Sequence, residues 1–239
     1  MNTPVKIKTS FKWNGDAAIT IYFNEQAGEE LIRTIQFLSE VLRNTFSNEL
    51  IDVVPAYQSL TLYLDVLNIN IEAIELSIKE TTERYLKEQI KPHKPNLIKI
   101  PVCYNEEYGT DLAGLGEHCN MSVTEVITLH TQEDYLVNML GFLPGFLYLS
   151  GLKEQLHCPR KSTPLLKVPA GAVAIGGGQT GIYPVESPGG WHIIGRTPIS
   201  IFNPNTETPF IAKPLDKVRF FSISKEEYIQ LRQLSKEVQ

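Results

Sequence analysis

The most restrictive feature of this sequence is the density of glycine between residues 168 and 198. Eight of the sixteen glycines in the 239-residue chain lie between Gly171 and Gly195. Glycine loses more backbone entropy on folding than any other residue, so a cluster is kept where positive φ angles or close backbone approach are needed. A flexible linker would be poor in apolar residues, whereas Val, Ile, Tyr and Trp are interleaved here. We therefore predict short strands joined by tight turns, and a functional site rather than a spacer.

The composition excludes several classes of protein. Apolar residues make up 42% of the chain and charged residues 21%, and no apolar run approaches the roughly 18 residues that a membrane helix needs. The net charge is −5 without a basic cluster, which argues against a nucleic-acid partner. The opening MNTPVKIKTSFKW has no signal-peptide pattern, and the three cysteines are widely spaced. We expect a cytoplasmic protein with reduced thiols, without membrane association or a nucleic-acid partner.

Residues 1–92 are predicted to form a small ferredoxin-like α+β domain. Apolar residues at helical spacing predict amphipathic helices over residues 25–46 and 71–85. Alternating apolar and polar residues predict strands over residues 17–23 and 60–66. This order of elements favours a split β-α-β sandwich, with the helices on one face of a mostly antiparallel sheet.

Residues 93–239 are predicted to form a mainly β domain, after a boundary at the proline-punctuated segment 91–95. A capping box at residues 122–125 opens a helix, and Ser224 caps a C-terminal helix. Many short strands between Gly and Pro turns favour a closed or half-closed barrel. The expected strands cover residues 97–103, 134–140, 167–175, 193–203 and 217–223.

Three familiar motifs fail in their context. Residues 176–181 have the spacing of a dinucleotide fingerprint, but residues 182–184 (Ile-Tyr-Pro) do not open the helix that would hold a pyrophosphate. Ser187 lies in an ESPGG sequence, so we expect a turn residue and not a nucleophile. The pairs His118-Cys119 and His157-Cys158 lack a second pair at metal-ligand spacing, so no metal site is expected.

Four polar side chains are candidates for chemistry, and three of them have an alternative interpretation. Arg196 either binds a carboxylate or phosphate or pairs with a nearby acid, and His192 beside it is either titrating or a satisfied turn residue. His130 is either a general acid or base, or a histidine at a helix C-terminus. Arg160 is a second candidate for anion binding.

The segment GFLPGFLY at residues 141–148 alternates aromatic residues with turn-formers. Exposed apolar loops commonly contact a ligand or a partner. The alternative is a hydrophobic plug over one end of the barrel.

These motifs resemble the KipI family, also called the PxpB or 5-oxoprolinase B-subunit family, which is related to the first-subunit domain of allophanate hydrolase. The resemblance is carried by residues 104–112, 125–130, 141–149, 159–160 and 168–198. It implies a cyclophilin-like β-barrel after a smaller α+β domain. Where the family typically has an arginine and a serine, this chain has Leu165 and Ala172, which puts any role of those positions in doubt.

The resemblance also implies a function and partners. Family members act with a larger KipA-like or PxpC-like protein and with a PxpA-like protein in ATP-dependent opening of 5-oxo-L-proline to L-glutamate. ATP is then expected at the level of the complex, with no metal or organic cofactor in this chain. The alternative is a KipI-type inhibitor that binds a sporulation sensor histidine kinase. A protein related to allophanate hydrolase or urea amidolyase is a third interpretation.

Under the hydrolase interpretation, catalytic roles are expected for His130, His192 and Arg196. Residues expected to bind substrate or stabilise an oxyanion are Arg160, Gly177, Gly178, Gln179, Thr180, Tyr183 and Trp191. Residues expected to contact a partner are Phe142, Pro144 and Phe146.

Overall fold

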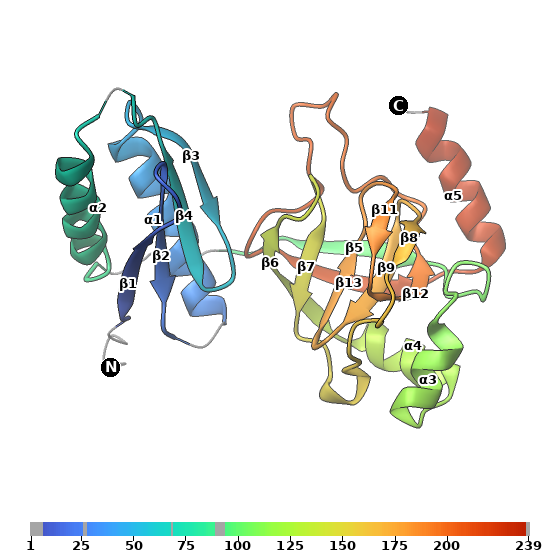
Figure 1. Ribbon diagram of the computed structural model, residues 1–239. Coiled ribbons are helices and arrows are strands. Elements are labelled where there is room, and N and C mark those ends of the chain that lie inside the picture. The colour runs from blue at the N-terminus through green and yellow to red at the C-terminus, as the bar shows by residue number, and fades with distance from the viewer. Residues whose placement is uncertain (1–6, 26–27, 68, 89–93, 238–239) are drawn as a thin grey trace. The chain divides into compact units, whose positions relative to one another are not determined.

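The structure is a computed structural model that describes residues 7–25, 28–67, 69–88 and 94–237 (Figure 1). The chain divides into two compact units, residues 1–94 and 95–239, and each has its own hydrophobic core. The boundary expected after residue 92 lies outside the described residues.

The N-terminal unit is a four-stranded antiparallel sheet in the order β1-β2-β4-β3, with two helices packed on one face. Side chains alternate along β2, so that Ile19 and Ile21 join the core while Thr20 faces away and hydrogen-bonds Thr61. The elements are β1 (Thr9–Trp13), β2 (Ala18–Phe23), α1 (Glu29–Thr45), β3 (Leu50–Pro55), β4 (Ser59–Leu64) and α2 (Ile71–Tyr85).

This topology contains the predicted split β-α-β unit. Strands β2 and β3 are both antiparallel to β4, so they are parallel to each other, with β4 between them and α1 as the crossover. The sequence did not predict β1, which pairs with the free edge of β2. In a ferredoxin-like sheet the strand at this edge comes from the end of the domain. Here the same place is taken by β1, from the start of the unit.

The C-terminal unit is built on a seven-stranded sheet in the order β12-β9-β10-β7-β6-β13-β5. The sheet curls until its two edges meet, because Cys103 after β5 and Arg196 at the end of β12 exchange backbone hydrogen bonds of 2.9 and 3.0 Å. The expected cyclophilin-like β-barrel is confirmed. Its elements are β5 (Leu97–Val102), α3 (Leu112–Cys119), α4 (Val123–Gln132), β6 (Asp134–Leu140), β7 (Leu147–Ser150), β8 (Leu165–Val168), β9 (Ala172–Gly176), β10 (Gln179–Ile182), β11 (Ser187–Gly189), β12 (His192–Arg196), β13 (Lys217–Ser222) and α5 (Lys225–Glu237).

Three local predictions for this unit were wrong, and one helix was missed. Residues 167–175 form two strands instead of one, because the chain turns at Gly171, whose φ is +81°. The strand expected to reach residue 203 ends at Arg196, shortly before Pro198. Ser187, expected in a turn, begins the short strand β11, which pairs with β8. Helix α3 was not predicted.

The glycine-rich segment forms strands and tight turns, as predicted. Gly177, with a φ of +64°, lies in the turn between β9 and β10, and no helix follows it. Two other glycines make room for the indole of Trp191. A Cβ on Gly176 would lie 2.6 Å from the Trp191 ring, and one on Gly181 would lie 3.0 Å from that ring and 2.6 Å from the Leu147 carbonyl oxygen. Trp191 is thus packed directly against the backbone of β9 and β10.

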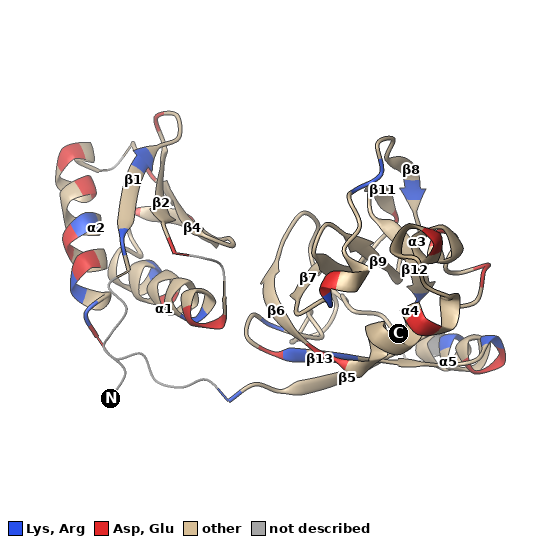
Figure 2. Ribbon diagram, turned by 90° about the horizontal axis from the view of Figure 1, so that it is seen from below, with Lys and Arg blue, Asp and Glu red and all other residues tan. Residues whose placement is uncertain are grey.

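The helices show the predicted capping. The Ser122 hydroxyl accepts from the Glu125 N–H while the Glu125 carboxylate accepts from the Ser122 N–H, which completes the capping box of α4. Basic and acidic residues are interspersed on α1, α2 and α5 (Figure 2). Among the described residues, no helix combines the length and apolar character needed to cross a membrane.

We predict that Gly181→Ala destabilises the C-terminal unit, because the added methyl group meets backbone and the Trp191 ring. The expected loss in free energy of unfolding is about 1–3 kcal/mol, typical of overpacking. The measurement is urea unfolding followed by tryptophan fluorescence. The control is Gly114→Ala in α3, where a Cβ meets nothing within 4 Å. That change should leave stability equal or raise it by up to about 1 kcal/mol. Equal stability of the two variants would contradict the packing described.

Candidate functional site

An aromatic pocket of about 370 Å³ lies beside the glycine-rich strands. Phe146 is its floor: this ring is 2% exposed and lies within 4.7 to 5.7 Å, between centroids, of four other rings. The four neighbouring rings belong to the loop after β6, to β7 and to the glycine-rich segment. They are Phe142, Tyr148, Tyr183 and Trp191.

One cation faces this pocket. The guanidinium of Arg160 lies 5.8 Å from the centroid of the Trp191 ring, within the range of a cation–π contact. Arg160 is exposed and lines the pocket. Burial raises the pKa values of Tyr148 and Tyr183, and the charge of Arg160 opposes this rise, so both hydroxyls are neutral at physiological pH. The pocket therefore combines apolar ring faces with a single positive charge.

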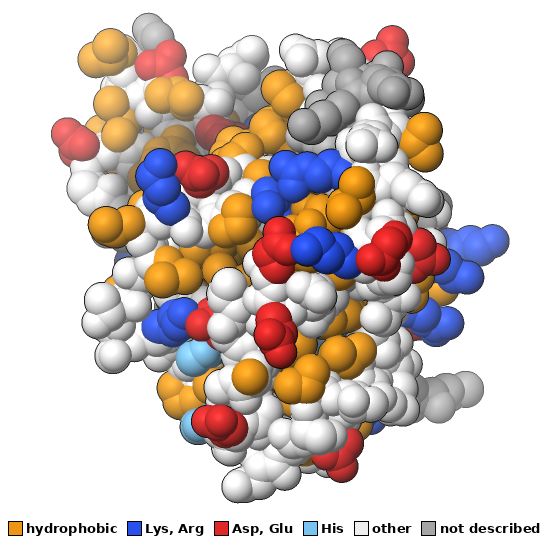
Figure 3. All heavy atoms as spheres, turned by 90° about the vertical axis from the view of Figure 1, so that its right-hand side faces the viewer, with side chains coloured by type: hydrophobic (Ala, Val, Ile, Leu, Met, Phe, Trp, Pro, Cys, Tyr) orange, Lys and Arg blue, Asp and Glu red, His pale blue; other side chains and the backbone are white. Residues whose placement is uncertain are grey.

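A second, charged pocket of about 420 Å³ is lined by Arg196, Lys161, Lys167, Asp111 and Glu107. Both acidic groups already have partners. Asp111 accepts hydrogen bonds from Lys161 Nζ at 2.5 Å and from the Ile193 N–H at 2.8 Å, and Glu107 pairs with Lys225. On the face of the C-terminal unit seen in Figure 3, acidic and basic side chains likewise adjoin one another, with hydrophobic side chains between them.

Arg196 is half-buried in the charged pocket. Its Nε donates to the Ala170 carbonyl oxygen at 2.8 Å, which fixes the side chain without neutralising it. Burial lowers the pKa of Arg196, and the charge of Arg232 acts in the same direction. No acidic side chain among the described residues is ion-paired with Arg196. The alternative that Arg196 merely pairs with a nearby acid is therefore disfavoured.

One short segment separates the two pockets. Arg160 lines the aromatic pocket, and the next residue, Lys161, lines the charged one. Likewise, Pro164 lines the aromatic pocket and Leu165 the charged one. The Lys161 N–H donates to the Gly190 carbonyl oxygen at 2.8 Å, which ties this segment to the glycine-rich turn. Leu165, where the family pattern carries an arginine, thus lies in the charged pocket.

His130 lies in the core of the barrel and is 0% exposed. The Thr180 hydroxyl donates to the Ala174 carbonyl oxygen, so it accepts from His130 Nε2 at 2.9 Å. His130 Nδ1 then accepts from the Tyr104 hydroxyl at 2.8 Å. Both ring nitrogens are occupied, and burial lowers the pKa of His130 to about 3. This environment favours a structural role over the predicted proton transfer.

The residues expected to stabilise an oxyanion do not lie together in either pocket. The Gly177 N–H already donates to the Cys158 carbonyl oxygen at 2.7 Å, and the Thr180 hydroxyl belongs to the His130 network. Gly178 is exposed in the turn, against the His157 ring, and Gln179 is half-buried at the start of β10. Their expected role stays a prediction, and the contacts of Gly177 and Thr180 favour structural roles.

His192 is half-buried on β12. Its Nε2 donates to the Pro159 carbonyl oxygen at 2.8 Å. This bond holds the backbone immediately before Arg160, so His192 helps to position the cation of the aromatic pocket.

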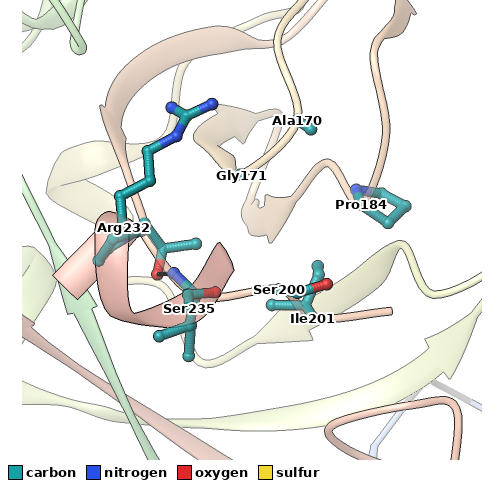
Figure 4. A pocket seen from close by; sticks show the side chains of 10 residues that line it. Ala170, Gly171, Pro184, Ser200, Ile201, Arg232 and Ser235 are labelled. Atoms are coloured by element: carbon teal, nitrogen blue, oxygen red, sulfur yellow. Dashed lines mark hydrogen bonds between the residues drawn. The ribbon is translucent and has the colours of Figure 1, made fainter. Parts of the chain in front are cut away.

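A third, smaller pocket of about 190 Å³ lies between α5 and the loops of the barrel (Figure 4). Arg232 extends from α5 toward the segment that carries Ala170 and Gly171, and its Nη1 donates to the Tyr228 hydroxyl at 2.7 Å. None of the predicted site residues lines it. Across the described part of the chain, no group of three or more His, Cys, Asp or Glu side chains is placed to hold a metal ion.

Comparison with known proteins agrees with this architecture. The family model described as "Carboxyltransferase domain, subdomain C and D" matches residues 9–212. The chain belongs to the carboxyltransferase C and D subdomain family. The predicted resemblance is confirmed by two relatives, each named as the B subunit of 5-oxoprolinase. The one from Bacillus subtilis (strain 168) is 36% identical over 90% of this chain and 92% of its own length. The one from Escherichia coli O157:H7 is 42% identical over 71% of this chain and 77% of its own length.

A solved structure, that of TTHA0988, has a similar fold. It is 35% identical, superposes with a TM-score of 0.73 and covers 87% of this chain. This chain covers only 40% of that protein, so it spans less than half of the solved relative.

Several residues of the two pockets were not predicted from the sequence. Tyr148 belongs to the aromatic loop motif, and Asp111 and Tyr108 belong to the YNEEYGTDL motif, so membership of these motifs was the available signal. Lys161 follows Arg160 directly, but only the structure shows that the two side chains serve different pockets.

We predict that His130 makes the stability of this family member depend on pH. Its pKa is about 3 in the folded protein and 6.5 when unfolded, so the unfolded state binds more protons between these values and stability falls as pH falls. Between pH 7 and pH 5 this effect amounts to about 2 kcal/mol. His130→Gln, which retains a donor and an acceptor, should lose that part of the pH dependence in urea unfolding at the two pH values. An identical pH dependence in both proteins would refute the assignment.

Proposed function

We propose that this chain is the B component (PxpB) of an ATP-dependent 5-oxoprolinase complex that opens 5-oxo-L-proline to L-glutamate. The observation that carries the proposal is the aromatic pocket with one cation, Arg160, against Trp191, in a chain whose relatives are named as the B subunit of 5-oxoprolinase. We propose a cytoplasmic location as well.

The chemistry of the aromatic pocket suits this substrate. 5-Oxo-L-proline is a small five-membered lactam with one carboxylate. The faces of Phe146 and Trp191 offer an apolar surface to the ring, and the guanidinium of Arg160 offers two parallel donors to the carboxylate.

We propose that the charged pocket binds phosphate oxygens. Opening a stable lactam needs the free energy that ATP supplies to the complex. Arg196 and Lys161 line this pocket, and Arg196 has no acidic partner among the described residues. Leu165 stands where the family typically has an arginine, so this pocket has one positive charge fewer. We expect a partner protein to supply the missing charge. Because consecutive residues line the two pockets, a carboxylate on one side and a phosphate on the other are held by one segment.

We assign His192 a positioning role through its hydrogen bond to the Pro159 carbonyl oxygen. His130 is assigned to the barrel core, on the evidence of its occupied ring nitrogens.

The proposed partners are a larger PxpC-like or KipA-like protein and a PxpA-like protein. Phe142 and Pro144 are both exposed, and Phe142 lines the aromatic pocket, whereas Phe146 is buried. Phe142 is 61% exposed and has a φ of +68°, a strained conformation for a large side chain. The first two residues are therefore suited to partner contact, and Phe146 supports them. The same exposed ring also suits the alternative, inhibition of a sensor histidine kinase.

The complex provides the test of the proposed function. Glutamate and ADP production from 5-oxo-L-proline and ATP is measured with the copurified proteins of the complex, omitting each in turn. We expect turnover to disappear when this chain is omitted and to return when it is added back. Full turnover without this chain would contradict the proposal and favour kinase inhibition.

We predict that Arg160→Ala lowers kcat/KM of the reconstituted complex by about 10-fold to 100-fold, the value of a charge-assisted hydrogen bond. The matched control is Arg219→Ala, since Arg219 is an exposed arginine of the same unit that pairs with Asp134 on the surface. It should retain full activity. Equal activities of the two variants would show that Arg160 does not hold the substrate.

We predict that Phe142→Gly weakens association with the larger partner protein at least about tenfold, because an exposed aromatic anchor is lost. Its own stability should be unchanged or higher, since a left-handed conformation costs a non-glycine residue about 1–2 kcal/mol. The measurements are calorimetric titration and thermal unfolding, with the exposed Phe221→Ala as control. Unchanged association would contradict the partner role, and loss of kinase inhibition with intact turnover would favour the alternative function.

A further inference from the structure

Ser187 has a buried hydroxyl without a partner. The residue is 7% exposed, and its Oγ has no hydrogen-bond partner in the part of the chain that the structure describes. Nearly all buried polar groups in folded proteins are hydrogen-bonded, and leaving one unpaired costs free energy. An alanine at this position would avoid that cost, so the presence of a serine needs an explanation.

The backbone holds this hydroxyl in place. Ser187 pairs with Val168 of β8, and the register shifts between Ser187 and Gly189. Along this strand Ser187 and Gly189 are buried and Pro188 is exposed, as expected for alternating faces. Ser187 lines the aromatic pocket together with Gly189. Its orientation is therefore set by strand pairing and not by a hydrogen bond of its own.

A second hydroxyl lies on the same wall of the pocket. A Cβ on Gly189 would lie 2.3 Å from the Tyr183 hydroxyl oxygen, so this glycine leaves the space that the hydroxyl occupies. Burial raises the pKa of this hydroxyl, and the Trp191 backbone opposes the rise, so the hydroxyl keeps its proton. Ser187 and Tyr183 thus give a mostly apolar pocket a polar wall, and Arg160 gives it a charge.

We propose that Ser187 Oγ hydrogen-bonds the amide group of a small cyclic amide whose carboxylate is held by Arg160. The rings of Phe146 and Trp191 would contact the apolar part of the same molecule, which accounts for all three kinds of group in this pocket. Ser187 is then the residue that distinguishes a lactam from a cyclic acid of the same shape that lacks the amide. This inference rests on the proposed function for the identity of the substrate.

Binding to the full-length chain tests the inference without catalysis. The chain has two tryptophans, so a Trp13→Phe background leaves Trp191, which lines the pocket, as the fluorescent reporter. In this background Ser187→Ala is compared with Ser222→Ala, a change at an exposed serine of β13. Each protein is titrated with 5-oxo-L-proline and with cyclopentanecarboxylate, which has the ring and the carboxylate but no amide. Thermal unfolding of the unliganded proteins is measured in parallel.

We expect Ser187→Ala to weaken binding of 5-oxo-L-proline about tenfold, the value of one hydrogen bond in a desolvated site. Binding of cyclopentanecarboxylate should not change, and the thermal midpoint should be equal or higher, because an unpaired buried hydroxyl has been removed. Ser222→Ala should match the parent in all three measurements.

Two results overturn the assignment of Ser187 while the proposed function stands: equal binding of 5-oxo-L-proline by the parent and by Ser187→Ala, or weaker binding of both ligands with a lower thermal midpoint. The second result would identify a structural serine. No binding of 5-oxo-L-proline by the parent protein would contradict both the assignment and the use of this pocket in the proposed function.

Discussion

The packing of one indole ring against bare backbone is the contact on which the functional half of this molecule depends. Trp191 lies against Gly176 and Gly181 of two adjacent strands, at distances that no Cβ would allow. One side of the ring therefore packs on strands β9 and β10. The ring also lines the aromatic pocket, next to Phe146 and Arg160. This contact and the tight turns beside it both require glycine, which explains why glycines are so dense in this segment. The packing of the sheet and the shape of the aromatic pocket therefore depend on the same side chain.

The second constraint is the separation of charge around that pocket. The segment that follows β7 places Arg160 on one side and Lys161 on the other, so an apolar pocket with one cation adjoins a pocket rich in charge. His192 fixes the backbone before Arg160 through the Pro159 carbonyl oxygen. Under the proposed function, the first pocket holds a substrate with a carboxylate and a chemically inert amide, and the second holds the phosphate oxygens needed to activate that amide.

The sequence predicted the parts of the fold that local patterns specify. Helix α4 follows from its capping box, and strands β2 and β4 of the N-terminal sheet follow from alternation. Patterns did not predict how segments distant in sequence meet. The break between β8 and β9 depends on the positive φ of Gly171, which any glycine in this segment could adopt. The edge strand β1 forms because it pairs with β2. Similarly, the sequence marked Arg160, Tyr183, Trp191 and the aromatic loop as candidates, and the fold brings them into one pocket.

The sequence was least informative about burial. His130 has the residue type and the position of a proton-transfer group, yet tertiary packing places it between Tyr104 and Thr180 with no exposed atom. Ser187 shows the reverse: its turn-like surroundings gave no reason to choose it. Only the structure shows that it lines the aromatic pocket and that its hydroxyl is buried without a partner among the described residues. Burial arises from contacts across the whole unit, which local sequence does not encode.

A crystal structure of this chain with 5-oxo-L-proline, in the presence of its partner proteins, would test the central claim most directly. The account predicts the lactam ring on the faces of Phe146 and Trp191, with its carboxylate on the guanidinium of Arg160. A lactam bound beside Arg196, with the aromatic pocket empty, would contradict it.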